Sequence, residues 1–305
     1  VAAMRANQLL RCLPVLLALS LSGARAQEGG SLDPAPLPPL ASAGPSTPAK
    51  EVFGRKARPA RLPPRAIGFY SRGCFAGGQA LPLEGQTWQV MRPSRNRYWG
   101  HPKLIAFLEQ FSAKVPAING WPGILVGDVA QPRGGPMITG HASHQIGLDA
   151  DLWLTAMPGR KLSRSDREEI AAINLVRQDR RDVDPSAYTL AHMKLVRAMA
   201  QEPEVARIFI NPAIKRALCR DAGPDRAWLA KVRPLWGHNY HFHIRLHCPP
   251  GECRDQDPVP QGDGCGDDLD RWFTREMLFP GPGAPPPPLL LSQLPAECSK
   301  VLAAP

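Results

Sequence analysis

Three features are missing from this chain of 305 residues, and each absence excludes a class of protein. The sequence has no C-x-x-C pair, which argues against a zinc site built from cysteines. It has no helix-turn-helix, zinc-finger or RNA-binding signature, which argues against a nucleic-acid partner despite a formal net charge of +10. It also lacks the run of about 20 apolar residues that a membrane-spanning helix needs. We therefore expect neither a nucleic-acid partner nor a transmembrane segment.

The first residues have the pattern of a secretory signal. Arg5 and Arg11 precede an apolar run at residues 12–21, and Ala24-Arg-Ala26 has the small-x-small form that signal peptidase cleaves. We predict a signal peptide over residues 1–26 and a periplasmic protein. Removing its three arginines lowers the net charge from +10 to +7. This sign favours an anionic partner, although charge that keeps the protein soluble explains it equally well.

Proline and glycine divide the rest of the chain. Residues 27–65 are rich in proline and are predicted to form a flexible segment. A polyproline-like stretch opens the tail over residues 280–305. The sequence between them, residues 66–279, is predicted to be one folded domain without an internal repeat.

Helical and strand patterns alternate within this domain. Helical spacing of apolar residues covers 101–115 and 190–200, a capping box is expected at 165–168, and Asn211-Pro212 begins another helix. Strands are predicted at 87–91, 124–129, 148–154, 205–210 and 240–246. The predicted class is α+β, with a small central antiparallel sheet surrounded by helices and loops, stapled by disulfides, and with a site on one sheet face.

Two histidine clusters, at residues 141–144 and 238–243, contain five of the eight histidines. In the predicted strand 240–246, a period of two sends His241 and His243 to the same face. In the predicted strand 148–154, Asp149 and Asp151 share one face, opposite apolar residues. Imidazole and carboxylate groups are ligands that zinc selects, so the two clusters predict one metal site.

Six cysteines remain after the predicted signal: Cys74, Cys219, Cys248, Cys253, Cys265 and Cys298. An even number in an exported protein indicates disulfides. Their spacing alone does not choose among the possible pairings.

The pattern H-x-x-H-x-x-x-x-x-x-D followed by H-x-x-H-x-H resembles the penicillin-insensitive murein endopeptidases. These are zinc metallopeptidases of the superfamily that includes lysostaphin-type and D-Ala-D-Ala peptidases and the hedgehog signalling domain. Segments at 134–137, 207–215, 229–234 and 262–266 are similar to the same family, so the resemblance covers about residues 66–305.

The resemblance implies roles for individual residues. Zn²⁺ would be held by His144, Asp151 and His243, with His241 and His238 as catalytic residues. His141 matches a further site histidine and is a candidate ligand of a second metal. An acidic–histidine pair of the family falls on Asp179 and Asp182, where the histidine is missing, so these two are less favoured. The implied disulfides are Cys74–Cys298, Cys219–Cys265 and Cys248–Cys253.

The implied activity is hydrolysis of the D-alanyl–diaminopimelyl amide that cross-links peptidoglycan stem peptides. An enzyme without a serine nucleophile should be insensitive to β-lactams. Arg245 is a candidate for binding a substrate carboxylate, because a guanidinium can grip one bidentately. A D,D- or L,D-carboxypeptidase and a catalytically silent zinc-containing module are the alternatives. The oligomeric state stays open, with a dimer as one candidate.

Overall fold

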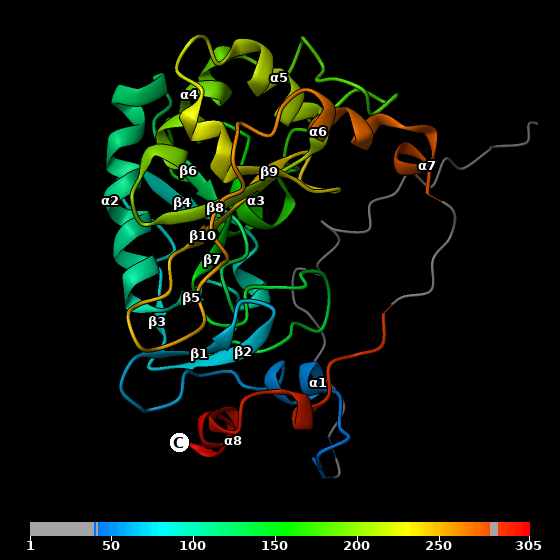
Figure 1. Cartoon of the computed structure of the whole chain (residues 1–305). Helices are drawn as coiled ribbons and strands as arrows, with labels where there is room; N and C mark the ends of the chain where they lie inside the picture. Colours follow the sequence, from blue (N-terminus) through cyan, green and yellow to red (C-terminus); the bar gives the residue numbers. More distant parts are fainter. Residues whose placement is uncertain (1–39, 41, 281–285) are drawn as a thin grey trace, which may run out of the picture.

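The computed structural model describes residues 40, 42–280 and 286–305 and is built around a six-stranded sheet (Figure 1). The predicted signal peptide lies outside the described residues. The strands in spatial order are β4 (Trp88–Val90), β6 (Ile124–Val126), β7 (Asp149–Trp153), β10 (His241–Leu246), β8 (Val205–Ile210) and β9 (Val232–Pro234).

The prediction of a small, purely antiparallel sheet is wrong. The inner pairs are antiparallel, but β4 and β6 run parallel, as do β8 and β9. Parallel neighbours need a long crossover, which helices usually supply. Here α2 (Pro102–Asn119) lies between β4 and β6 in the chain, and α5 (Pro212–Asp221) lies between β8 and β9. The α+β class itself is confirmed.

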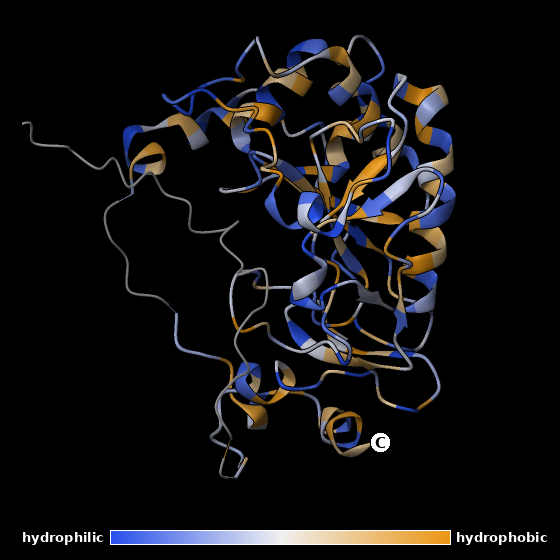
Figure 2. Ribbon diagram, turned by 180° about the vertical axis from the view of Figure 1, so that it is seen from behind, coloured by the Kyte–Doolittle hydropathy of each residue, from blue (hydrophilic) through white to orange (hydrophobic). Residues whose placement is uncertain are grey.

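The two faces of the sheet differ in polarity. The apolar residues of β7, β8 and β10 point to a core that they share with α2 and with α4 (Leu190–Gln201). In Figure 2 these hydrophobic residues appear in orange in the central strands and along α2. The alternate positions of the same strands carry aspartate, histidine and arginine. One face of the sheet therefore packs on the core, and the other carries the polar residues from which the site was predicted to be built.

A second, smaller core lies beneath the hairpin of β1 (Arg65–Phe69) and β2 (Arg72–Ala76). Here α1 (Ala49–Phe53) and α8 (Glu297–Ala303) bury Phe53 and Val301, and Cys74 of β2 is bonded to Cys298 of α8 (Figure 1). The tail is thus tethered through Cys298, as predicted. The predicted flexible segment 27–65 differs from the structure, because its residues 49–53 form a packed helix.

The other two implied disulfides are also present. Cys219–Cys265 joins α5 to the segment before α6 (Asp267–Asp270), and Cys248–Cys253 closes a loop directly after β10. None of the helices in the described part of the chain is long and apolar enough to cross a membrane.

The remaining elements are short. The predicted capping box lies two residues earlier than expected, with Ser163 and Asp166 capping α3 (Arg164–Glu169). The others are β3 (Gln79–Ala80), β5 (Trp99–Gly100), α7 (Arg275–Leu278) and the 3₁₀ turns η1 (Pro93–Arg95), η2 (Ala227–Lys231), η3 (Arg271–Phe273) and η4 (Leu291–Gln293).

Candidate metal centre

The register between β7 and β10 brings the two predicted clusters together. His243 is paired with Asp151, and Arg245 is paired with Asp149. Residues paired across antiparallel strands project from the same face, so these four side chains meet on the polar side of the sheet. The loop that carries His141 and His144 leads into β7 and adds two more imidazoles.

Asp151 is the centre of this arrangement. Its Oδ1 lies 3.4 Å from His144 Nε2, 3.4 Å from His243 Nδ1 and 3.7 Å from His241 Nε2. Its Oδ2 lies 3.5 Å from His141 Nδ1. One buried carboxylate is thus within reach of four imidazoles.

These groups fit a divalent metal. In the part of the chain that the structure describes, His141, His144 and Asp151 form one group whose ligand atoms all lie within 4.8 Å of one another. His144 Nε2 and Asp151 Oδ1 are buried and have no hydrogen-bond partner among the residues that the structure describes. Buried polar atoms without partners are costly. A cation between them would remove that cost, and imidazole and carboxylate are ligands suited to zinc.

The protonation states also fit metal binding. Burial opposes ionisation of Asp151, but the imidazoles of His241, His144 and His141 outweigh it and hold its pKa well below the usual value. Burial lowers the pKa of His241 to about 3 and that of His243 to about 4, against the attraction of the aspartates. Burial acts to lower the pKa of His144, but Asp151 outweighs it and raises this pKa. At neutral pH the site therefore contains an anionic carboxylate and the neutral imidazoles of His241 and His243, and a metal ion would displace any proton on His144 Nε2.

Local hydrogen bonds aim His144 at the centre. Its Nδ1 lies 2.5 Å from the carbonyl oxygen of Val129; because a carbonyl can only accept, the Nδ1–H donates this hydrogen bond, and Nε2 is the nitrogen that can bind a metal. The backbone φ angles of His144 and His238 are 65° and 49°, values that non-glycine residues seldom adopt. Such strain is often found at functional sites.

Asp128 is a site residue that the sequence did not reveal. Its Oδ2 lies 3.0 Å from His141 Nε2 and 2.9 Å from the guanidinium of Arg97. Burial opposes its ionisation, but His141 and Arg97 hold its pKa well below the usual value. A single aspartate after the apolar strand β6 gave no signal by itself, because its partners come from other segments.

Comparison with known proteins now places the chain. The family described as penicillin-insensitive murein endopeptidase matches residues 66–303. The chain belongs to this family. A relative of that name from Haemophilus influenzae is 47% identical over 240 residues, which cover 75% of this chain and 81% of the relative. One from Yersinia enterocolitica is 45% identical over 243 residues, covering 78% and 86%. The resemblance on which the site residues were chosen is thus confirmed.

In this family member, Arg245 does not point into open solvent to meet a substrate. Its Nε lies 2.9 Å from Asp149 Oδ1 and its Nη2 3.3 Å from Asp149 Oδ2. The guanidinium also lies over the ring of Tyr70, 4.1 Å from the centroid. The expected substrate-binding role of Arg245 is corrected accordingly: the register puts a carboxylate of the protein itself opposite this arginine.

Asp149 connects this arginine to the metal site. Its Oδ1 lies 3.3 Å from His243 Nε2, the ring nitrogen that faces away from Asp151. Its Oδ2 accepts a hydrogen bond of 2.9 Å from the backbone nitrogen of His144. One carboxylate therefore positions both histidines from outside the ligand group.

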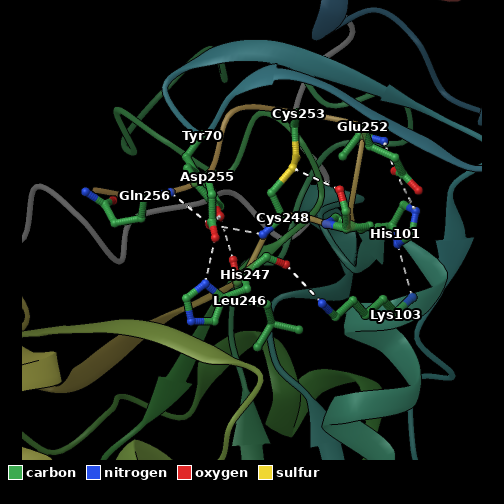
Figure 3. Close-up of a disulfide and its surroundings, with 12 residues drawn as sticks. Tyr70, His101, Lys103, Leu246, His247, Cys248, Glu252, Cys253, Asp255 and Gln256 are labelled. Atoms are coloured by element: carbon green, nitrogen blue, oxygen red, sulfur yellow. Dashed lines mark hydrogen bonds and ion pairs between the residues drawn. A yellow bond between two sulfur atoms is a disulfide. The ribbon is translucent and has the colours of Figure 1, made fainter. Parts of the chain in front are cut away.

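Figure 3 shows the Cys248–Cys253 disulfide together with Asp255 and Gln256, which follow the loop that it closes. Gln256 Oε1 accepts a hydrogen bond of 2.6 Å from Arg245 Nη1. The neighbouring Asp255 accepts hydrogen bonds from Tyr70 Oη at 2.9 Å and from the backbone nitrogen of Cys248 at 3.1 Å. Contacts through Asp255, Gln256, Arg245 and Asp149 thus connect the Cys248–Cys253 loop to His243.

The remaining predicted residues separate into two groups. His238 joins the site: its ring lies 4.8 Å from that of His241 and 6.1 Å from that of His243, between centroids. Asp179 and Asp182 are instead paired with Arg177 and Arg220. They are not part of the ligand group around Asp151.

Proposed function

We propose that this protein is a periplasmic, zinc-dependent murein endopeptidase. It would hydrolyse the D-alanyl–diaminopimelyl amide that cross-links peptidoglycan stem peptides. The observation that carries the proposal is the buried Asp151 Oδ1, which has no hydrogen-bond partner among the described residues and faces imidazoles in a chain of this family. The signal-like N-terminus and the three disulfides support export.

His144, Asp151 and His243 would hold the metal. His144 offers Nε2 and His243 offers Nδ1, and both lie 3.4 Å from Asp151 Oδ1. His141 is the competing third ligand, because its ligand atom belongs to the close group. The chemistry that zinc supplies when bound is Lewis-acid activation of a carbonyl and a lowering of the pKa of water from about 15.7 to about 7.

His241 would act on the reacting amide. It is buried beside Asp151, and its low pKa keeps the ring neutral at pH 7. A neutral imidazole can donate a hydrogen bond to a developing oxyanion or carry a proton to the leaving amine. His238 is half-buried, its ring lies next to that of His241, and it would assist in substrate binding or proton movement. No serine takes part, so a β-lactam has no nucleophile to acylate.

The test is mass spectrometry of purified cross-linked muropeptide dimers after incubation with the zinc-loaded protein. Conversion of dimers to two monomers is expected, and benzylpenicillin should not prevent it. EDTA treatment and the variant His144→Ala should each leave the dimers intact. Loss of a terminal alanine in place of dimer cleavage would show a carboxypeptidase. Intact dimers and intact monomeric stems in every sample would overturn the enzymatic assignment.

A further inference from the structure

The polar face of the sheet continues beyond the metal site to its edge strand. His243 is paired with Phe209 of β8, and Phe209 is paired with Arg233 of β9. Their neighbours Ile208 and Val232 are completely buried in the core. Arg233 therefore projects from the same face as His243. Two strand spacings of about 4.8 Å put its backbone roughly 10 Å from that of His243.

Arg233 lines a cavity of about 400 Å³. Other lining residues are Pro234, Gly264, Asp268, Arg271 and Trp272. This places the cavity between β9 and the segment around α6, which Figure 1 shows beside that strand. A Cβ atom at Gly264 would lie 3.1 Å from Arg233 Nη1, and the residue has a φ of 66°. A larger residue there would crowd the guanidinium, so glycine keeps Arg233 open to the cavity.

The cavity lining carries more positive than negative charge, because Asp268 is paired with Arg271 at 3.3 Å and not with Arg233. Within the described residues, the Arg233 side chain has no hydrogen bond and no carboxylate oxygen within 4.0 Å. Its cationic neighbours Arg207 and Lys215 bond only to backbone carbonyls, those of Ala206, Asp257, Leu229 and Asp263. Burial lowers the pKa values of Arg207 and Lys215, Asp263 partly offsets the shift of Lys215, and the charge of Arg233 lowers both pKa values further. An anion in the cavity would relieve this repulsion.

We propose that Arg233 binds a carboxylate of the peptidoglycan stem peptide and that this cavity is a substrate subsite. The inference rests on the proposed function. A separation of roughly 10 Å corresponds to about three residues of an extended peptide. An extended stem that runs from the metal site to the cavity would thus place there a carboxylate about three residues from the amide that is cut. A guanidinium can hold it through two parallel hydrogen bonds, and the indole of Trp272 forms an apolar wall.

The experiment compares two substrates and three variants. Wild type, Arg233→Gln and Arg233→Lys are each incubated with two substrates. One is a cross-linked dimer with free stem carboxylates, and the other is the same dimer with these carboxylates amidated. Arg197→Gln is the matched control, because Arg197 is a surface cation on α4 that is paired with Asp225. Arg233→Gln should lower kcat/KM on the free dimer by about 10- to 100-fold, mainly through KM. Arg233→Lys should recover part of this loss, and the control should resemble wild type.

Amidation is the decisive arm. Wild type should lose activity on the amidated dimer, whereas Arg233→Gln should lose little more than it has already lost. An unchanged KM in Arg233→Gln, or an equal loss on both substrates, would overturn the subsite while leaving the endopeptidase assignment intact. If wild type cleaves no dimer, calorimetric binding of a free stem tetrapeptide to wild type and Arg233→Gln still decides the question. Equal Kd values would reject the subsite.

Discussion

Replacing Asp149 by asparagine should weaken the metal site although Asp149 is not itself a proposed ligand. Asp149 is completely buried and contacts Arg245, His243 and the backbone of His144. Asparagine keeps the size of the side chain but removes its charge. Arg245, which is 6% exposed, would then be a buried cation without its carboxylate.

The expected effect has two parts. Removing one partner of a buried ion pair typically costs about 3–5 kcal/mol of unfolding free energy. Removing a carboxylate that orients a ligand histidine typically lowers metal affinity by about 10- to 100-fold. Both should appear in Asp149→Asn, because the same carboxylate serves Arg245 and His243.

Urea unfolding of the metal-free protein measures the first part, and competition with a chromogenic zinc chelator measures the second. The chelator titration is run at a temperature where both proteins are folded. Asp225→Asn is the matched control, because its ion pair with Arg197 is at the surface and should contribute no more than about 1 kcal/mol. A folded Asp149→Asn protein with wild-type zinc affinity would refute the positioning role.

Three further predictions concern other parts of the molecule. His241→Ala should retain zinc but lower kcat by about 10²- to 10⁴-fold, and a parallel loss of bound zinc, measured by metal analysis, would make His241 a ligand. Replacing both Cys74 and Cys298 by serine should lower the unfolding free energy in urea by about 2–5 kcal/mol, since the tail loses its covalent attachment to β2; an unchanged midpoint would contradict this. Burial lowers the pKa of Lys215 from 10.5 to about 7 in the folded protein. Between these two pH values the unfolded chain therefore binds more protons than the folded protein. The free energy of unfolding should then rise with pH, by at most about 1.4 kcal/mol per pH unit. Lys215→Met should flatten that rise in urea unfolding measured from pH 7 to 10, and an equal slope in both proteins would show that Lys215 does not cause it.

The sequence predicted the strands that form the site because their pattern is regular. Residues 205–210 match β8, and residues 240–246 contain β10 with one extra residue. It did not predict β9, which is three residues long and ends at Pro234. Nor did it predict the β1–β2 hairpin, because Gly68 and Gly73 lie within the two strands and weaken the strand pattern in the sequence. These elements depend on tertiary pairing more than on local pattern.

The errors at the site have the same origin. Period two put His241 and His243 on one face, but it could not give the register that pairs Arg245 with Asp149. Asp128 was missed because its contacts with His141 and Arg97 join separate segments of the chain. Helix α1, which lies away from the site, was also missed. The proline-rich composition around it predicted a flexible segment, and Phe53 packs in a small core with residues of α8, which the Cys74–Cys298 bond holds to β2.

The apolar face of the sheet fixes the geometry of the polar one. Leu152, Phe242 and Ile244 alternate with the site residues and are all completely buried. Because side chains alternate with a period of two, a slip of one residue in either strand would turn that strand's apolar side chains toward the site. At roughly 1.5–3 kcal/mol for each large apolar side chain exposed, a slip of β10, which moves Phe242 and Ile244, would cost on the order of 3–6 kcal/mol. Packing of the core therefore aligns Asp151 with His243 before any metal binds, and the metal-free protein should already hold its ligands in place.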